Sequence, residues 1–183
     1  MAELISDIEL LEQFKNSSSK ERAFTAILKK YQEKIYWHIR RMVVEHEDAN
    51  DVLQNMFVKV WKGLENFRED SQLYTWLYRI ATNESLTFLA QQKKRNSVFI
   101  SVEENGLSNS VRADSNFDGN KLEWKLQLAI QKLPEKQKVV FNLRYYDEMP
   151  YAEMSSVLET SEGALKASYH HAVKKIEEYI LNN

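Results

Sequence analysis

Apolar residues recur every three or four positions along most of this chain, and one stretch between residues 96 and 120 interrupts the pattern. Such spacing predicts amphipathic helices, each with one inward-facing stripe. The 183 residues include only four glycines and two prolines, which favours long helices with short connections over a turn-rich β fold. The sequence therefore predicts an all-α fold, divided into two small helical domains.

Four helices are predicted in the first half of the chain. The first ends at the polar run 16–19, where Ser18, followed three residues later by Glu21, predicts a capping box that opens the second. The third is expected from about residue 48 to 64 and the fourth from about 73 to 94. Their expected inward stripes are Leu4, Ile8, Leu11 and Phe14; Phe24, Ile27, Leu28, Tyr31, Ile35 and Ile39; Val52, Met56 and Val60; and Leu77, Ile80, Ala81 and Leu89.

Residues 96–120 are rich in Asn, Ser, Asp and Glu, hold two of the four glycines, and have only scattered apolar residues. This composition is typical of a flexible linker. We expect a first domain over residues 5–95, a linker over 96–121 and a second domain over 122–183.

A short helix, a three-residue turn and a longer helix are predicted near the end of the chain. Pro150 opens the first of these helices, residues 159–161 form the turn, and Ser161 can cap the second helix. This is the layout of a helix-turn-helix, whose second helix enters the DNA major groove. Spacing alone equally allows a helical hairpin with a solvated face. The outer face of the last helix carries Glu162, Lys166, His170, His171 and Lys174.

Aromatic residues lie among Arg and Asn between residues 66 and 95, and the segment ends in three consecutive cations. Rings beside Arg and Asn suit single-stranded DNA, whose bases stack on rings while cations follow the backbone. Each aromatic taken singly is better explained as a core residue, and the cluster as a whole is better evidence than its members. The cluster includes Phe67, Tyr74, Trp76, Tyr78 and Phe88, with Arg68, Arg79 and Asn83.

The net charge of −2 is unevenly spread, with 15 Lys/Arg against 14 Asp/Glu in residues 1–95 and 10 against 13 in residues 96–183. A protein that binds DNA alone usually has a basic footprint. This chain is therefore expected to bind DNA weakly by itself, with a partner supplying much of the phosphate contact.

Four segments, in order, resemble the sigma-70 family of RNA polymerase factors, and the size and layout resemble its extracytoplasmic-function (ECF) subfamily. Residues 48–61 (DANDVLQNMFVKVW) resemble the polymerase-binding helix, and residues 67–68 with 75–83 (TWLYRIATN) resemble the minus-ten promoter region. Residues 133–137 (LPEKQ) resemble the opening of the C-terminal domain, and 153–166, ending in SEGALK, its helix-turn-helix. The resemblance covers nearly the whole chain.

The resemblance implies a cytoplasmic factor that binds core RNA polymerase through the clamp helices of its largest subunit and directs initiation at promoter DNA. It also implies an anti-sigma factor as a candidate partner. The implied polymerase-binding residues are Asp51, Gln54, Asn55, Val58 and Lys59. The implied minus-ten residues, around a loop that holds a flipped-out base, are Phe67, Arg68, Ser71, Trp76, Arg79 and Asn83. The implied minus-thirty-five residues are Arg144, Ser161, Lys166, His170, His171 and Lys174.

The chain departs from the family pattern at several positions. Glu159 stands where the turn usually has Gly, which predicts a different turn geometry. Ser168 and His171 stand where the recognition helix often has Arg, which predicts a weaker grip on phosphate. Thr87 and Ala90 stand where the minus-ten region often has Asp and Arg.

Two other classes of function place different demands on the sequence. A free-standing helix-turn-helix regulator would need a ligand pocket or dimer interface where residues 48–61 face a polymerase. A helical hydrolase or nuclease would need a set of convergent catalytic groups, and we identify no catalytic residue, cofactor or metal site.

A calcium loop starting at Asp114 would place Lys125 where a Glu is required. No cysteine is present, and no apolar run approaches the roughly 20 residues of a membrane span, so no membrane insertion is expected.

Overall fold

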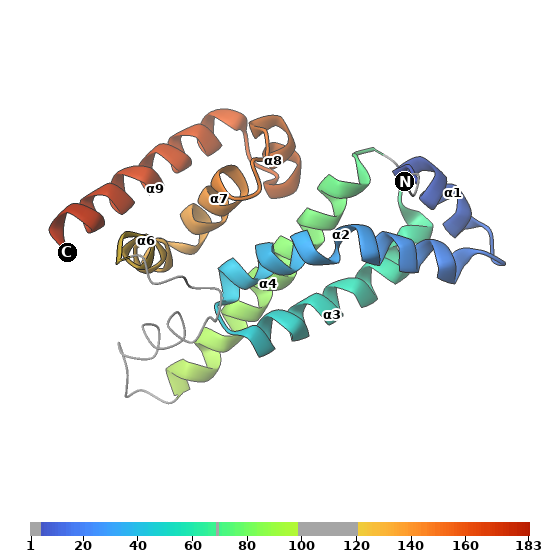
Figure 1. The fold of residues 1–183 in the computed structure, drawn as a ribbon, viewed down its shortest axis with the longest axis horizontal. Coiled ribbons are helices and arrows are strands. Elements are labelled where there is room, and N and C mark those ends of the chain that lie inside the picture. The colour runs from blue at the N-terminus through green and yellow to red at the C-terminus, as the bar shows by residue number, and fades with distance from the viewer. Residues whose placement is uncertain (1–4, 69, 99–120) are drawn as a thin grey trace.

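The computed structural model of the protein describes residues 5–68, 70–98 and 121–183, and these form two helical domains (Figure 1). This confirms the predicted all-α, two-domain fold. The first domain contains α1 (Asp7–Lys15), α2 (Lys20–Val43), α3 (His46–Gly63), the 3-10 turn η1 (Leu64–Asn66) and α4 (Leu73–Val98). The second contains α6 (Lys121–Gln131), α7 (Glu135–Tyr145), α8 (Tyr151–Leu158) and α9 (Glu162–Asn182).

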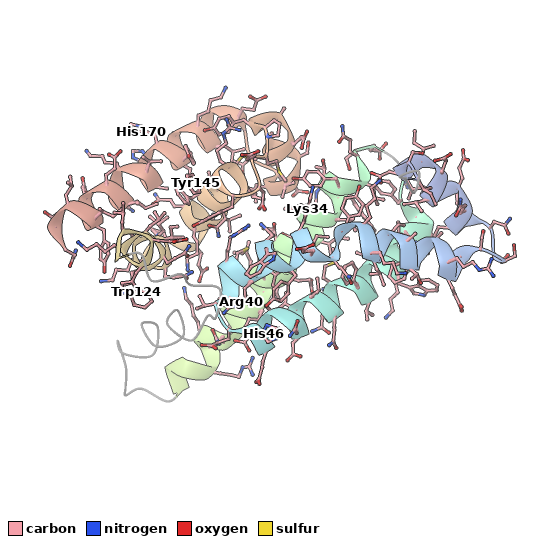
Figure 2. All side chains as sticks on the ribbon, viewed as in Figure 1. Lys34, Arg40, His46, Trp124, Tyr145 and His170 are labelled. Atoms are coloured by element: carbon pink, nitrogen blue, oxygen red, sulfur yellow. The ribbon has the colours of Figure 1, made fainter. Side chains whose placement is uncertain are left out.

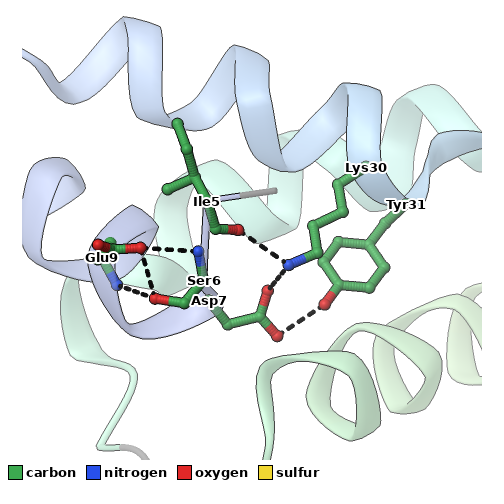
Figure 3. Close-up of polar contacts among 6 residues, drawn as sticks. All are labelled: Ile5, Ser6, Asp7, Glu9, Lys30 and Tyr31. Atoms are coloured by element: carbon green, nitrogen blue, oxygen red, sulfur yellow. Dashed lines mark hydrogen bonds and ion pairs between the residues drawn. The ribbon is translucent and has the colours of Figure 1, made fainter. Parts of the chain in front are cut away.

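The capping box of the first domain lies at the start of α1 (Figure 3). The Ser6 hydroxyl accepts a hydrogen bond from the Glu9 amide at 3.3 Å, and the Glu9 carboxylate accepts one from the Ser6 amide at 2.8 Å. The prediction of a box at Ser18 and Glu21 was wrong. Ser19 is the N-cap of α2 and has helical backbone angles, so no side chain caps that helix.

Asp7, the first residue of α1, links α1 to α2 by hydrogen bonds. Its carboxylate accepts hydrogen bonds from Lys30 Nζ and Tyr31 Oη, each at 2.7 Å (Figure 3). Burial raises the pKa of Tyr31, and the hydrogen bond to Asp7 and the negative charge of Asp7 raise it further. The inward stripe of α1 differs by one position from the prediction, because Leu10 is buried and Ile8 is exposed. Leu4 lies outside the described residues.

The core of the first domain includes the expected inward residues Ile27, Tyr31, Ile35 and Ile39 of α2, whereas Phe24 and Leu28 are only partly buried. The buried residues of α2 outside the predicted stripe are Ala23, Met42, Val43 and the polar residue His38. On α3 the predicted inward residues Val52, Met56 and Val60 are buried. The fourth helix extends to Val98, a turn beyond its expected end near residue 94. Residues 99–120 of the expected linker lie outside the described residues.

The second domain has a core cluster where α6, α7 and α9 meet, formed by Ala129, Ile130, Leu133, Phe141, Ala172 and Ile176. Pro134 caps α7 and Pro150 caps α8, as their fixed φ allows. In the described residues, no helix is long and apolar enough to cross a bilayer.

The two domains pack against each other, α7 against α2 and α8 against α4. The apolar core of the first domain continues without a break into α7 and α8. Second-domain residues in this shared cluster include Val139, Val140, Leu143, Met154, Val157 and Leu165.

Candidate polymerase and promoter interfaces

The residues expected to bind polymerase form one open face of α3. Asp51, Gln54, Asn55, Val58 and Lys59 are all exposed, on the side opposite the buried stripe of the helix. Val58 keeps 53% of its surface in solvent. The whole face is therefore free to meet a partner in this arrangement.

At the first turn of the same helix, Asp48 leans toward α4, where Gln92 Nε2 donates to its carboxylate at 3.4 Å. Burial, with the charges of Glu45 and Asp51, raises the pKa of Asp48. Farther along, the Lys59 ammonium pairs with Glu84 on α4. These contacts hold α3 and α4 in register, so that the open face of α3 is presented on a rigid support.

A cavity of about 290 Å³ lies beside the loop that joins η1 to α4. It brings together five of the six residues expected at the minus-ten element. The lining residues are Gly63, Asn66, Phe67, Arg68, Asp70, Ser71, Trp76 and Arg79 of the first domain and Ser156 of the second. The sixth expected residue, Asn83, is exposed one helical turn beyond Arg79 on α4.

Trp76 forms one wall of this cavity. Its ring centroid lies 5.0 Å from that of Phe67, and its indole reaches over the end of α3 at Gly63, where an added Cβ would lie 3.0 Å from the ring. Two half-buried rings beside Arg68 and Arg79 form a surface on which a base could stack. Tyr78, in contrast, is 1% exposed and belongs to the core, which settles the alternative in favour of packing for that residue.

Arg79 is held by the second domain. Its Nε donates to the Ser156 carbonyl at 3.0 Å, and its guanidinium lies 3.7 Å from the Glu159 carboxylate. Both partners are at the C-terminal end of α8. The arginine expected to contact promoter DNA is therefore occupied by this contact in the free chain.

The helix-turn-helix has the predicted layout. Ser161 caps α9, its hydroxyl accepting from the Ala164 amide at 3.3 Å. Glu159 ends α8 with φ 50° and ψ 43°, the left-handed conformation that Gly would adopt at little cost. A non-Gly residue thus stands in a conformation that Gly commonly adopts after a helix, and this backbone position is strained.

The outer face of α9 carries Lys166, His170, His171 and Lys174, all exposed. Figure 2 shows His170 on the outer edge of α9. The Lys166 ammonium lies 3.5 Å from Glu162 and 5.5 Å from the Tyr151 ring centroid, so it is lightly held. These two lysines and two histidines are available for a duplex in this arrangement.

Arg144, unlike the exposed residues of α9, makes its contacts inside the second domain. Its guanidinium donates to the Met149 carbonyl at 3.2 Å and lies over the Tyr151 ring, 5.2 Å from the centroid. Both contacts brace the turn between α7 and α8. Arg144 is half-buried and thus supports the helix-turn-helix from within the domain.

Asp147, which was not predicted as a functional residue, joins the two domains. Its carboxylate lies 3.0 Å from His38 Nδ1, 3.2 Å from Arg41 and 3.4 Å from Tyr78 Oη. The sequence offered one indication of this contact: His38 is a polar residue that lies three positions after Ile35, on the inward stripe of α2. In the described residues, no three His, Asp or Glu side chains are grouped to hold a metal ion.

Comparison with known proteins assigns this architecture to a class. The family Sigma-70 region 2 matches residues 27–95, and Sigma-70 region 4 matches residues 123–176. The chain belongs to the sigma-70 family of RNA polymerase sigma factors. Members of this family bind core RNA polymerase and direct promoter-specific initiation, and the regulator alternative is not favoured.

Curated relatives place the chain in the ECF subfamily. It is 29% identical over 188 residues to the ECF RNA polymerase sigma-E factor of Escherichia coli K12, covering 98% of this chain and 97% of the relative. It is also 29% identical over 180 residues to RNA polymerase sigma-H factor of Pseudomonas aeruginosa PAO1, covering 94% and 92%.

Solved structures share the fold. The sigma factor RpoE of Bartonella quintana, crystallised with the anti-sigma factor NepR, matches with a TM-score of 0.70 and 18% identity over 86% of this chain and 96% of that one. CnrH in complex with the cytosolic domain of CnrY matches with a TM-score of 0.69 and 20% identity over 95% and 96%.

Proposed function

We propose that the cavity beside η1 is where this sigma factor holds an unstacked base of the minus-ten element. The observation that carries the proposal is the convergence of Phe67, Arg68, Ser71, Trp76 and Arg79 around one cavity. Rings supply stacking surfaces, and the two arginines and the serine supply donors for base edges or phosphate. Asn83, one turn away, extends the same surface along α4.

The exposed face of α3, formed by Asp51, Gln54, Asn55, Val58 and Lys59, is proposed to bind the clamp helices of core polymerase. The outer face of α9 is proposed to read the minus-thirty-five duplex through Lys166, His170, His171 and Lys174, with Ser161 and Arg144 shaping the motif. The proposed domains are residues 5–95 and 122–183, joined by residues 96–121.

We further propose that the protein acts in the cytoplasm and has no catalysis of its own, since the polymerase forms the phosphodiester bonds. An anti-sigma factor is a proposed partner, because the structural relative RpoE was crystallised with the anti-sigma factor NepR.

Holoenzyme reconstitution tests the cavity. Trp76→Leu should lower the affinity of the holoenzyme for a fluorescent single-stranded minus-ten oligonucleotide on the order of tenfold, as expected for loss of one stacked base. Core binding should be unchanged. Tyr145→Leu, which removes a 50% exposed ring from the second domain, is the control. Equal affinities for the two variants would refute the proposed cavity.

Core binding is tested separately. Asp51→Ala and Gln54→Ala should each weaken the complex with core polymerase in a competition assay, because both side chains lie at the centre of the exposed α3 face. Glu21→Ala, an exposed change on α2, should leave it intact. A wild-type affinity in both α3 variants would show that polymerase binds elsewhere.

A further inference from the structure

A second cavity, of about 440 Å³, lies where α2 and α4 meet the turn between α7 and α8. It shares no described lining residue with the cavity beside η1. Its volume is in the range of sites that hold small ligands. Four of the described residues that line it are aromatic. The lining residues are Glu33, Lys34, Trp37, Arg41, Tyr74, Tyr78, Tyr146, Asp147 and Glu148.

The rings of this cavity come from both domains. Trp37 lies on α2, Tyr74 and Tyr78 lie on α4 with ring centroids 4.5 Å apart, and Tyr146 is the C-cap of α7. The face of an aromatic ring carries partial negative charge and attracts cations. One ring already holds a cation in this way, since the Arg41 guanidinium lies 4.3 Å from the centroid of Tyr146. The wall of the cavity is thus suited to a positively charged group.

The charged side chains of the lining leave an excess of negative charge. Arg41 and Asp147 lie 3.2 Å apart and neutralise each other. This leaves the exposed carboxylates of Glu33 and Glu148 against the single exposed ammonium of Lys34. Within the described parts of the chain, none of these three side chains makes a hydrogen bond or an ion pair. Two carboxylates are therefore available to a cation that enters the cavity, and one ammonium opposes it.

Two tyrosines of the lining respond to this negative charge. Burial raises the pKa of Tyr74, and the charges of Asp147 and Glu153 raise it further. Burial and the charge of Asp147 also raise the pKa of Tyr78. Negative charge that disfavours a phenolate at these hydroxyls disfavours any other anion there and favours a cation. The environment of the rings therefore argues against a phosphate or carboxylate ligand, although two cations belong to the lining.

The cavity beside η1 has a different character. Its rings, Phe67 and Trp76, lie beside the guanidinium groups of Arg68 and Arg79. Rings next to arginines suit the bases and phosphates of DNA. The cavity between α2 and α4 combines its rings with surplus carboxylates instead. The two cavities are therefore expected to take ligands of opposite charge.

We propose that the cavity between α2 and α4 is a binding site for a small organic cation, whose ammonium group contacts the rings of Trp37 and Tyr74 and is neutralised by Glu33 and Glu148. Two kinds of ligand share this chemistry. A primary amine such as putrescine carries N–H donors that the carboxylates accept. A quaternary ammonium such as choline has no N–H group and binds through the rings and its charge alone.

The test uses the full-length protein, titrated in a calorimeter with putrescine and, separately, with choline. Trp37→Leu removes a ring but keeps an apolar side chain on α2. It should weaken the binding of both probes on the order of fivefold, as expected for the loss of one contact between a cation and a ring. Trp124→Leu is the matched control, because Trp124 is a half-buried ring on α6 that is not part of the lining. It should leave both affinities unchanged.

The charge of the site is tested by Glu148→Gln, which keeps the shape of an exposed side chain and does not threaten the fold. It should weaken both probes on the order of threefold at low salt, and the loss should shrink at high salt because exposed charges are screened. Glu177→Gln, the same change at an exposed position of α9, is the control. Either probe supports the site, and a larger loss for putrescine than for choline identifies the ligand as an amine with N–H donors.

A wild-type protein that gives no binding heat and no rise in melting temperature with either probe at millimolar concentration would overturn the proposal, since a ligand of the folded chain raises that temperature. Wild-type affinities in both Trp37→Leu and Glu148→Gln would also overturn it, because the cations would then bind elsewhere on the surface. The oligonucleotide assays of the cavity beside η1 are independent of these outcomes, so the proposed function and this site stand or fall separately.

Discussion

Asp147 and His38 lie 109 positions apart in the chain and 3.0 Å apart in the structure, and their contact crosses from one domain to the other. His38 is fully buried and the Asp147 side chain nearly so. A hydrogen bond to a charged group in such surroundings is stronger than one in solvent, and leaving either partner alone is costly.

A double-mutant cycle measures this pair. Combining His38→Ala and Asp147→Ala should give a coupling energy of about 1.5–3 kcal/mol in the free energy of unfolding, the range for hydrogen bonds to charged groups. The exposed pair Lys166 and Glu162 is the comparison and should give about 0.3–0.5 kcal/mol. Urea unfolding of the four variants of each cycle provides the values. A coupling no larger than that of the exposed pair would contradict the buried contact.

Lys138 makes stability depend on pH. Burial lowers the pKa of Lys138 to about 8, with Lys93 adding to the effect and Glu135 opposing it. In the unfolded chain the pKa of a lysine is about 10.4. Between these values the unfolded chain binds more protons at Lys138, so the contribution of Lys138 to the free energy of unfolding should rise as pH is raised from 8 to 10.

Lys138→Met should remove most of that rise, and Lys136→Met, an exposed change two positions away, should preserve it. Urea unfolding at several pH values between 8 and 10 tests the difference. Burial also raises the pKa of Tyr31, Tyr74 and Tyr78, so these tyrosines lower the stability of both variants as the pH approaches 10, and the difference between the two variants isolates the effect of Lys138. Above pH 10 the unfolded chain loses the tyrosine proton first, and stability should fall. Parallel slopes for the two variants would place the titration elsewhere.

The helices could be predicted from sequence because they depend on spacing within a few turns, and the outward residues of α3 followed from the resemblance to a polymerase-binding helix. The capping box lies at Ser6 and not at Ser18, although both serines are followed by a Glu three residues later: Ser6 has the extended backbone of an N-cap, whereas α2 begins after Ser19, which has helical angles. Ile8 was assigned inward because spacing alone did not show which face of a two-turn helix its neighbours cover.

The contacts between the domains could not be predicted in the same way. Asp147 lies in a turn after α7, where an acidic residue is ordinarily solvated, and nothing local pairs it with α2. The cavity was predicted only in part, since Ser156 comes from the other domain. Long-range pairing of this kind depends on how the domains pack and leaves no periodic pattern in the chain.

Glu159 gives a prediction about backbone strain. A non-Gly residue in the left-handed region costs roughly 1–2 kcal/mol, and Gly recovers most of this while adding some entropy to the unfolded chain. Glu159→Gly should therefore raise the free energy of unfolding by up to about 1 kcal/mol. Glu159→Gln keeps the strain and should give no such gain in the same urea experiment. Equal stabilisation by Gln would point to charge as the cause.

Lys166 gives the prediction for the duplex. Its ammonium is exposed on the outer face of α9 and held only by a surface pair with Glu162. Lys166→Ala should weaken minus-thirty-five binding by the holoenzyme about fivefold and reduce the slope of log affinity against log salt by about 1, since one phosphate contact is lost. Lys175→Ala is the control, because Lys175 lies on the other side of α9 and donates to Gln137. Core binding should be unchanged in both variants. A reduced salt slope in Lys175→Ala alone would mean that the opposite side of α9 faces the DNA.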